Sequence, residues 1–186
     1  MIVLSEVTEN FYVPVAFAYL PGKSEEIYTT LFTSIICILK ELGFSLSANF
    51  IMCDFESGLR KSLQKCFPEI TIKGCHFHYG QCIWRFVQSY GMKKVFAENS
   101  GFRCLIQATI GLAFVSLERI EEALKVLELM GHEIKETQVK KFLKLFFGYL
   151  KSQWIYGNIP PGSWNYFLVQ SSTTNNFNEG YNHKLR

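Results

Sequence analysis

The chain has 186 residues, of which 48% are hydrophobic and 19% charged, and its formal net charge is +3. This length predicts one compact domain with a sizeable core. The longest apolar runs, "YVPVAFAYL" and "SIICIL", are too short for the roughly 18 to 20 residues that span a bilayer. The composition therefore argues against a membrane protein, whereas the mild positive charge is compatible with nucleic-acid contact and equally with ordinary solubility.

Two further features bear on the cellular compartment. The N-terminus has neither the basic region nor the long apolar stretch of a secretory signal. The cysteines form no CxxC pair, and Cys37, Cys53 and Cys104 stand inside apolar segments. We expect reduced core thiols in an intracellular protein.

The first half of the chain predicts an α/β fold. Residues 1–7 and 11–20 are β-branched and aromatic runs separated by "TEN", which is the pattern of an antiparallel hairpin. Ser24 then caps an amphipathic helix that ends at Gly43. Strand, helix, strand and helix follow at "SANFIMCDF", residues 56–67, "EITIKGC" and residues 78–90. The apolar stripe expected on the first helix consists of Ile27, Leu31, Ile35, Ile38, Leu39 and Leu42.

From about Gly101 the pattern predicts helices only. One stripe is formed by Ile120, Ala123, Leu124 and Leu127, and a second by Val139, Phe142, Leu143, Phe146, Leu150 and Trp154. The segment "YGNIPPGSW" ends these helices, and a polar tail follows. We expect an α/β core over residues 1–100, an all-helical insertion over 101–160 and a C-terminal segment over 161–186.

Asp54 is the only aspartate in the chain, and it stands at the end of a predicted strand. Strand ends are where α/β sheets bind ligands and metals. The alternative is a helix N-cap, because "DFES" leads directly into a helix and Asp is a favoured capping residue. Spacing alone favours the cap.

Two other elements carry polar side chains that suit a site. Cys75 and His78, in "CHFH", have the spacing of two metal ligands at a helix start, but without a second pair they make a poor zinc site. A buried thiol and a core histidine are the simpler interpretation. Near the C-terminus, "TTNN" (Thr173, Thr174, Asn175 and Asn176) precedes Glu179, and Thr or Asn there could cap a terminal helix.

Together these elements, in this order, resemble the transposases of Mutator-like elements (MULEs). The resemblance rests on "CDFE", "FPEITIKGCHFHYGQCIWR", a long helical stretch, and then "SWNYF", "TTNN" and "NEGYN", and it extends to "VPVAFAYLPGKSEEIY". It implies a ribonuclease-H-like mixed sheet with an all-helical insertion ahead of the last acidic residue. It also implies the motif positions Cys75, His78, Asn175 and Asn176.

The resemblance also implies a chemistry. In this family two aspartates and a glutamate hold two divalent ions, Mg²⁺ or Mn²⁺, which cut and join DNA strands. Asp54 corresponds to the second aspartate and Glu179 to the glutamate, so both are expected to be catalytic and to bind metal. The family's first aspartate lies on a strand ahead of the segment that matches residues 1–20. The sheet is therefore expected to lack its first strand, and this chain is expected to be inactive in DNA transposition and recombination.

Two other functions remain open at this stage. One is a domesticated, non-catalytic module that binds DNA or protein, for instance through Lys140, Lys141, Lys144 and Lys151, although a solvated helix face explains those lysines better. The other is a different α/β enzyme in which Cys75 or Cys82 acts as a nucleophile with His78. By resemblance we expect a nuclear protein whose partner is DNA, with no membrane contact and with oligomers possible.

Overall fold

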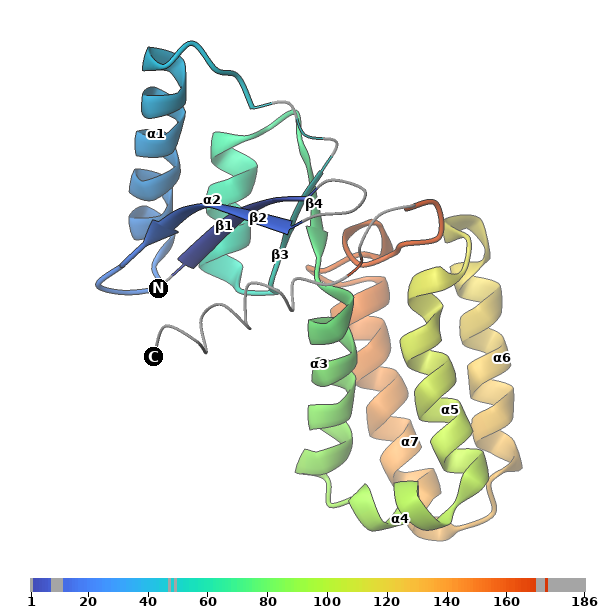
Figure 1. Ribbon diagram of the computed structural model, residues 1–186. Coiled ribbons are helices and arrows are strands. Elements are labelled where there is room, and N and C mark those ends of the chain that lie inside the picture. Colours follow the sequence, from blue (N-terminus) through green and yellow to red (C-terminus); the bar gives the residue numbers. More distant parts are fainter. Residues whose placement is uncertain (1, 8–11, 47, 49, 170–172, 174–186) are drawn as a thin grey trace. The chain divides into compact units, whose positions relative to one another are not determined.

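The computed structural model describes residues 2–7, 12–46, 48, 50–169 and 173. They divide into two compact units, Met1–Phe77 with Gln170–Arg186, and His78–Val169 (Figure 1). The domain boundaries expected at residues 100 and 160 stay predictions.

The first unit begins with the predicted hairpin, which is confirmed. Strands β1 (Ile2–Val7) and β2 (Tyr12–Ala18) pair antiparallel, with Ile2 opposite Ala18. The register is irregular between Leu4 and Ser5. Leu4 packs against the core of the unit, which ties the hairpin to the elements that follow.

A strand–helix–strand element follows the first helix. Strands β3 (Phe50–Cys53) and β4 (Thr71–Gly74) pair in parallel and are connected by helix α2 (Ser57–Cys66). Among the described residues, β1 with β2 and β3 with β4 form two separate two-stranded sheets. The α/β class is confirmed, whereas the mixed ribonuclease-H-like sheet stays a prediction.

Helix α1 (Glu25–Glu41) has the predicted ends. The Ser24 hydroxyl accepts a hydrogen bond from the Ile27 amide at 3.3 Å, and Gly43 adopts a left-handed φ of +76° that favours glycine. The predicted stripe is partly wrong, because Ile38 and Leu42 are exposed and the buried residues are Tyr28 and Phe32.

The core explains this shift. Tyr28 and Phe32 form one cluster with Cys53 of β3 and Leu63 of α2. Helix α2 approaches α1 closely at Gly58, where an added Cβ would lie 3.0 Å from the Lys23 carbonyl oxygen. The two helices therefore meet on the aromatic face of α1, and the aliphatic residues of the predicted stripe lie at its edge.

The cysteine prediction is correct for only part of the set. Cys53 and Cys75 are buried, as expected of core thiols, but Cys37 and Cys104 are exposed. Both exposed thiols lie on amphipathic helices, whose outer faces also carry occasional apolar residues, so an apolar neighbourhood in the sequence does not ensure burial.

The second unit consists of helices, and four of them run side by side in Figure 1 (α3, α5, α6 and α7). Its α-helices are α3 (His76–Ser89), α4 (Lys93–Glu98), α5 (Ser100–Gly111), α6 (Ile120–Glu133) and α7 (Thr137–Tyr149).

The apolar stripe predicted on α6 is confirmed at Ile120, Leu124 and Leu127, while Ala123 is only partly buried. The stripe predicted from Val139 to Trp154 is buried throughout and continues into a π-helical turn, Leu150–Ile155. Within the described residues, no helix combines the length and the apolar character that crossing a bilayer requires.

Candidate functional site

Asp54 lies directly after β3, at the C-terminal end of the parallel strand pair. The neighbouring strand β4 ends at Gly74, and the Cys75 amide donates a hydrogen bond to the Cys53 carbonyl at 2.9 Å. The carboxyl ends of adjacent parallel strands open into the crevice where α/β sheets bind ligands. The half-buried Asp54 therefore has the position of a ligand-binding carboxylate.

The N-cap interpretation of Asp54 is wrong. Helix α2 begins at Ser57, and its N-cap is Glu56, which has the extended backbone of a cap residue (φ −73°, ψ 121°). The turn after β3 is two residues longer than a cap at Asp54 would require. The simplest structural explanation for the aspartate is thus removed.

Glu56 belongs to a hydrogen-bonded network that the sequence did not reveal. Its carboxylate accepts a hydrogen bond from the Tyr28 hydroxyl at 2.6 Å and forms an ion pair with the Lys23 ammonium at 3.3 Å. Burial raises the pKa of Tyr28 above its usual range, the bond to Glu56 adds to this, and the charges of Glu56 and Asp54 raise it further. Both carboxylates of this turn therefore affect the pKa of the Tyr28 hydroxyl. Because Tyr28 and Glu56 are far apart in sequence, no local pattern could have indicated the pair.

Phe55, between the two acidic residues, packs on the end of β4. A Cβ added to Gly74 would lie 2.1 Å from the Phe55 ring, so only glycine allows this approach without a shift. The Arg60 guanidinium lies over that ring, 5.6 Å from its centre, and also contacts the Cys53 sulfur. The Phe55 ring therefore connects the turn that carries Asp54 to both β4 and α2.

The thiols beside Asp54 are poor nucleophiles. Burial raises the pKa of Cys53 to about 12, although the Arg60 charge acts in the opposite direction. Cys75 is fully buried, so a substrate does not reach its sulfur. These two observations argue against the cysteine-enzyme alternative at Cys75.

Cys75 immediately precedes α3, and His78 lies in its first turn. Among the residues that the structure describes, no three His, Cys, Asp or Glu side chains are grouped so as to hold a metal ion. Glu179, Asn175 and Asn176 lie outside the described residues, so their distances from Asp54 stay predictions.

Thr173 is described, and it lies beside the strand ends. Its carbonyl accepts a hydrogen bond from the His76 amide at 2.9 Å. Cys53 and Cys75 are joined by one backbone hydrogen bond, and His76 and Thr173 by another. The chain thus returns, after the whole helical unit, to the edge at which Asp54 stands.

The motif "SWNYF" has a structural role. The Trp164 ring stacks on Tyr79 of α3 with centroids 4.8 Å apart, and its indole N–H donates to the carbonyls of Trp154 and Ile159 at 3.0 and 3.1 Å. The buried Asn165 amide donates to the Val115 carbonyl at 2.7 Å. These contacts hold the exit of the helical unit next to its entry.

The basic positions singled out in the sequence lie mostly in solvent. Lys140, Lys141 and Lys144 are exposed on α7. Lys151 forms an ion pair with Glu128 at 2.6 Å. This is the arrangement of a solvated helix face, and it does not single out a nucleic-acid surface.

Residues 2–81 match the family model described as the MULE transposase domain, and the chain therefore contains a domain of that family. The match runs from β1 into α3 and includes Asp54, Cys75 and His78. No curated protein matches the chain, and no solved structure does. A transposase-related function, with DNA as the general partner, follows from the family.

We expect Tyr28→Phe to change how stability depends on pH. At pH 8 the variant should lose about 1 kcal/mol of unfolding free energy, because the hydrogen bond to Glu56 is gone. Tyr28 has a folded pKa above its unfolded value near 10, so its contribution is fully present below that pH and is lost above it. Urea unfolding between about pH 8 and 11 should fall less steeply for the variant. Equal slopes for both proteins would contradict the raised pKa of Tyr28.

Proposed function

We propose that this chain provides part of a metal-dependent site for DNA strand cleavage and transfer. Asp54 and Glu179 are the carboxylate ligands of Mg²⁺ or Mn²⁺, within a ribonuclease-H-like fold that works on DNA in the nucleus. Hard oxygen ligands suit these ions far better than the thiols and imidazoles nearby. Cys75 and His78 then support the strand ends instead of binding a metal.

The observation that supports this proposal is the return of the chain at Thr173. A ligand set drawn from both ends of the sequence requires the C-terminal segment to come back to the strand end that carries Asp54. The hydrogen bond from His76 to Thr173 brings the segment to that edge, a few residues ahead of Glu179. In the sequence Thr173 is followed by Thr174, Asn175 and Asn176, whose side chains carry oxygen atoms of the kind that bind these ions.

The arrangement of the strands is also compatible with the proposal. In a ribonuclease-H-like sheet a further strand lies between the hairpin and the parallel pair. Within the described residues no ladder connects β1 to β3, and yet Leu4 of β1 and Ile51 of β3 pack against one core. A strand inserted there would pair with the backbone of β1 on one side and with that of β3 on the other.

Metal-directed backbone cleavage tests the site without requiring catalysis. Fe²⁺ replaces Mg²⁺ at oxygen-ligand sites, and with ascorbate and peroxide it generates radicals that cut the chain close to the ion. We expect cuts near both Asp54 and Glu179, suppressed by excess Mg²⁺. Asp54→Asn should remove both cuts, whereas Glu69→Gln, at an exposed position on the loop before β4, should leave them unchanged.

The possible outcomes separate the two parts of the proposal. If the original chain is cut near Asp54 but not near Glu179, and if Glu179→Gln keeps the cut near Asp54, then the glutamate is not a ligand. The absence of cuts at either residue would overturn the metal site. The non-catalytic binding module would then be the better hypothesis, since DNA binding by the exposed lysines needs no ion.

A further inference from the structure

Helix α6 has a partly exposed stripe of side chains along one face. It carries a basic and an acidic residue, then a small and several apolar residues, then a second acidic residue. Val126 stands at its middle with 51% of its surface exposed, and Leu129 is 65% exposed. The stripe is formed by Arg119, at the N-cap, followed by Glu122, Ala123, Val126, Leu129, Met130 and Glu133.

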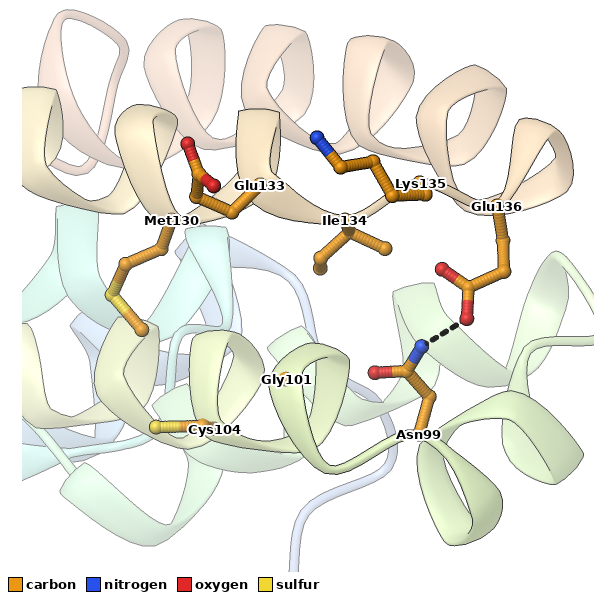
Figure 2. A pocket seen from close by; sticks show the side chains of 8 residues that line it. All are labelled: Asn99, Gly101, Cys104, Met130, Glu133, Ile134, Lys135 and Glu136. Carbon is orange, nitrogen blue, oxygen red and sulfur yellow. Dashed lines mark hydrogen bonds between the residues drawn. The ribbon is translucent and has the colours of Figure 1, made fainter.

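A groove runs beside this stripe between α5 and α6. It consists of two hollows of about 500 and 400 Å³ that share Met130. Figure 2 shows one end, where Met130 extends toward the Cys104 side and the Asn99 amide donates to the Glu136 carboxylate at 2.6 Å. The α5 side of the groove is lined by small residues at helical spacing, namely Gly101, Cys104, Ala108 and Gly111. Small residues let another helix approach closely.

We propose that this groove binds α6 of a second copy of the chain, with the two α6 helices antiparallel about a twofold axis at Val126. In that register Leu129 of one copy faces Ala123 of the other, so a large side chain meets a small one. Arg119 faces Glu133 of the second copy, so opposite charges meet at both ends of the stripe. The same surface serves both copies, as a twofold interface requires.

Charge and shape both favour a second copy over an unrelated helix. Arg119 now forms an ion pair with Glu122 of its own helix at 2.9 Å. Both groups are exposed, so this pair is weak and Arg119 can reach a second carboxylate. Leu129 is 65% exposed, and in this register the hollow beside Ala123 of the second copy offers it space. The interface lies within the helical unit and does not depend on the proposed metal site.

The length of α6 limits the area that the two copies can bury. Helix α6 has 14 residues, and at about 1.5 Å per residue it is roughly 21 Å long. We expect two such helices with their flanking grooves to bury an area at the low end of specific interfaces. We therefore expect a dimer with a dissociation constant in the micromolar range.

Sedimentation of the full chain between about 1 and 200 µM tests the proposal. A reducing agent is required because Cys37 and Cys104 are exposed. Leu129→Glu places a charge in the centre of the interface and should raise the dissociation constant at least about tenfold. The matched control is Leu145→Glu, at a 50% exposed leucine on α7, which should leave the constant unchanged. Circular dichroism confirms that each variant is folded.

A charge exchange tests the register. Arg119→Glu and Glu133→Lys each bring like charges together, so each variant alone should dimerise more weakly than the original chain. Mixed together, they should form a heterodimer, because both end pairs are then opposite in sign. A chain that stays monomeric across the concentration range would overturn the proposal. So would a dimer insensitive to Leu129→Glu, or variants that show no preference for each other when mixed.

Discussion

DNA strand cleavage by the purified chain is expected to stay at background with either Mg²⁺ or Mn²⁺. Two-metal catalysis needs a carboxylate that bridges both ions, and Asp54 with Glu179 leaves at least one ion weakly held. Because the members of such a set act as a unit, the loss of one removes most of the acceleration, on the order of 10³-fold or more. The assay uses DNA that carries the cognate ends and measures both cut and joined products.

The informative comparison is a form extended upstream of Met1 by a strand that ends in an aspartate. That form should cleave DNA, and Asp54→Asn should abolish its activity. Cleavage by the 186-residue chain that Asp54→Asn abolishes would mean that another carboxylate, such as Glu6 or Glu56, completes the site. Of the two, Glu56 is less suited to bind a metal, because the metal would compete with its contacts to Tyr28 and Lys23.

Local sequence patterns predicted the elements of this fold well. Runs of β-branched and aromatic residues predicted the hairpin, Ser24 and Gly43 marked the ends of α1, and the apolar period of α7 predicted its buried face. Each of these signals lies within one helix or within one pair of neighbouring strands. Asp54 could be placed at a strand end for the same reason, because a short apolar run directly precedes it.

Features that depend on tertiary contacts could not be predicted in this way. The aromatic face of α1 is buried because α2 approaches at Gly58, and nothing within α1 distinguishes that face from the aliphatic one. The Tyr28–Glu56 hydrogen bond joins two elements, and so does the contact from His76 to Thr173. The position of Asp54 at a strand end could therefore be predicted from the sequence, whereas the contacts that join distant segments around it could not.

In the sequence the helical unit lies between Asp54 and Thr173, and its two ends are held together. Tyr79, in the first turn of α3, stacks on Trp164 with an interplanar angle of 7°. Both rings are fully buried, and Trp154 packs edge-on against Tyr79 at 4.9 Å. Since the chain enters and leaves this unit at neighbouring points, the segment after Trp164 begins close to where α3 begins. A long insertion is thereby compatible with ligands drawn from both sides of it.

Trp164→Ala is expected to destabilise the helical unit by about 3 to 5 kcal/mol, because it removes a buried ring and leaves a cavity beside Tyr79 and Trp154. Trp164→Phe keeps an aromatic ring but loses the indole donor, so the Trp154 and Ile159 carbonyls lose a partner and about 1 to 3 kcal/mol should be lost. The control is Phe167→Ala, an exposed aromatic residue in the same segment, with an expected change below about 1 kcal/mol. Urea unfolding followed by circular dichroism measures all three. Equal losses for Trp164→Ala and Phe167→Ala would contradict the role of Trp164 in closing the unit.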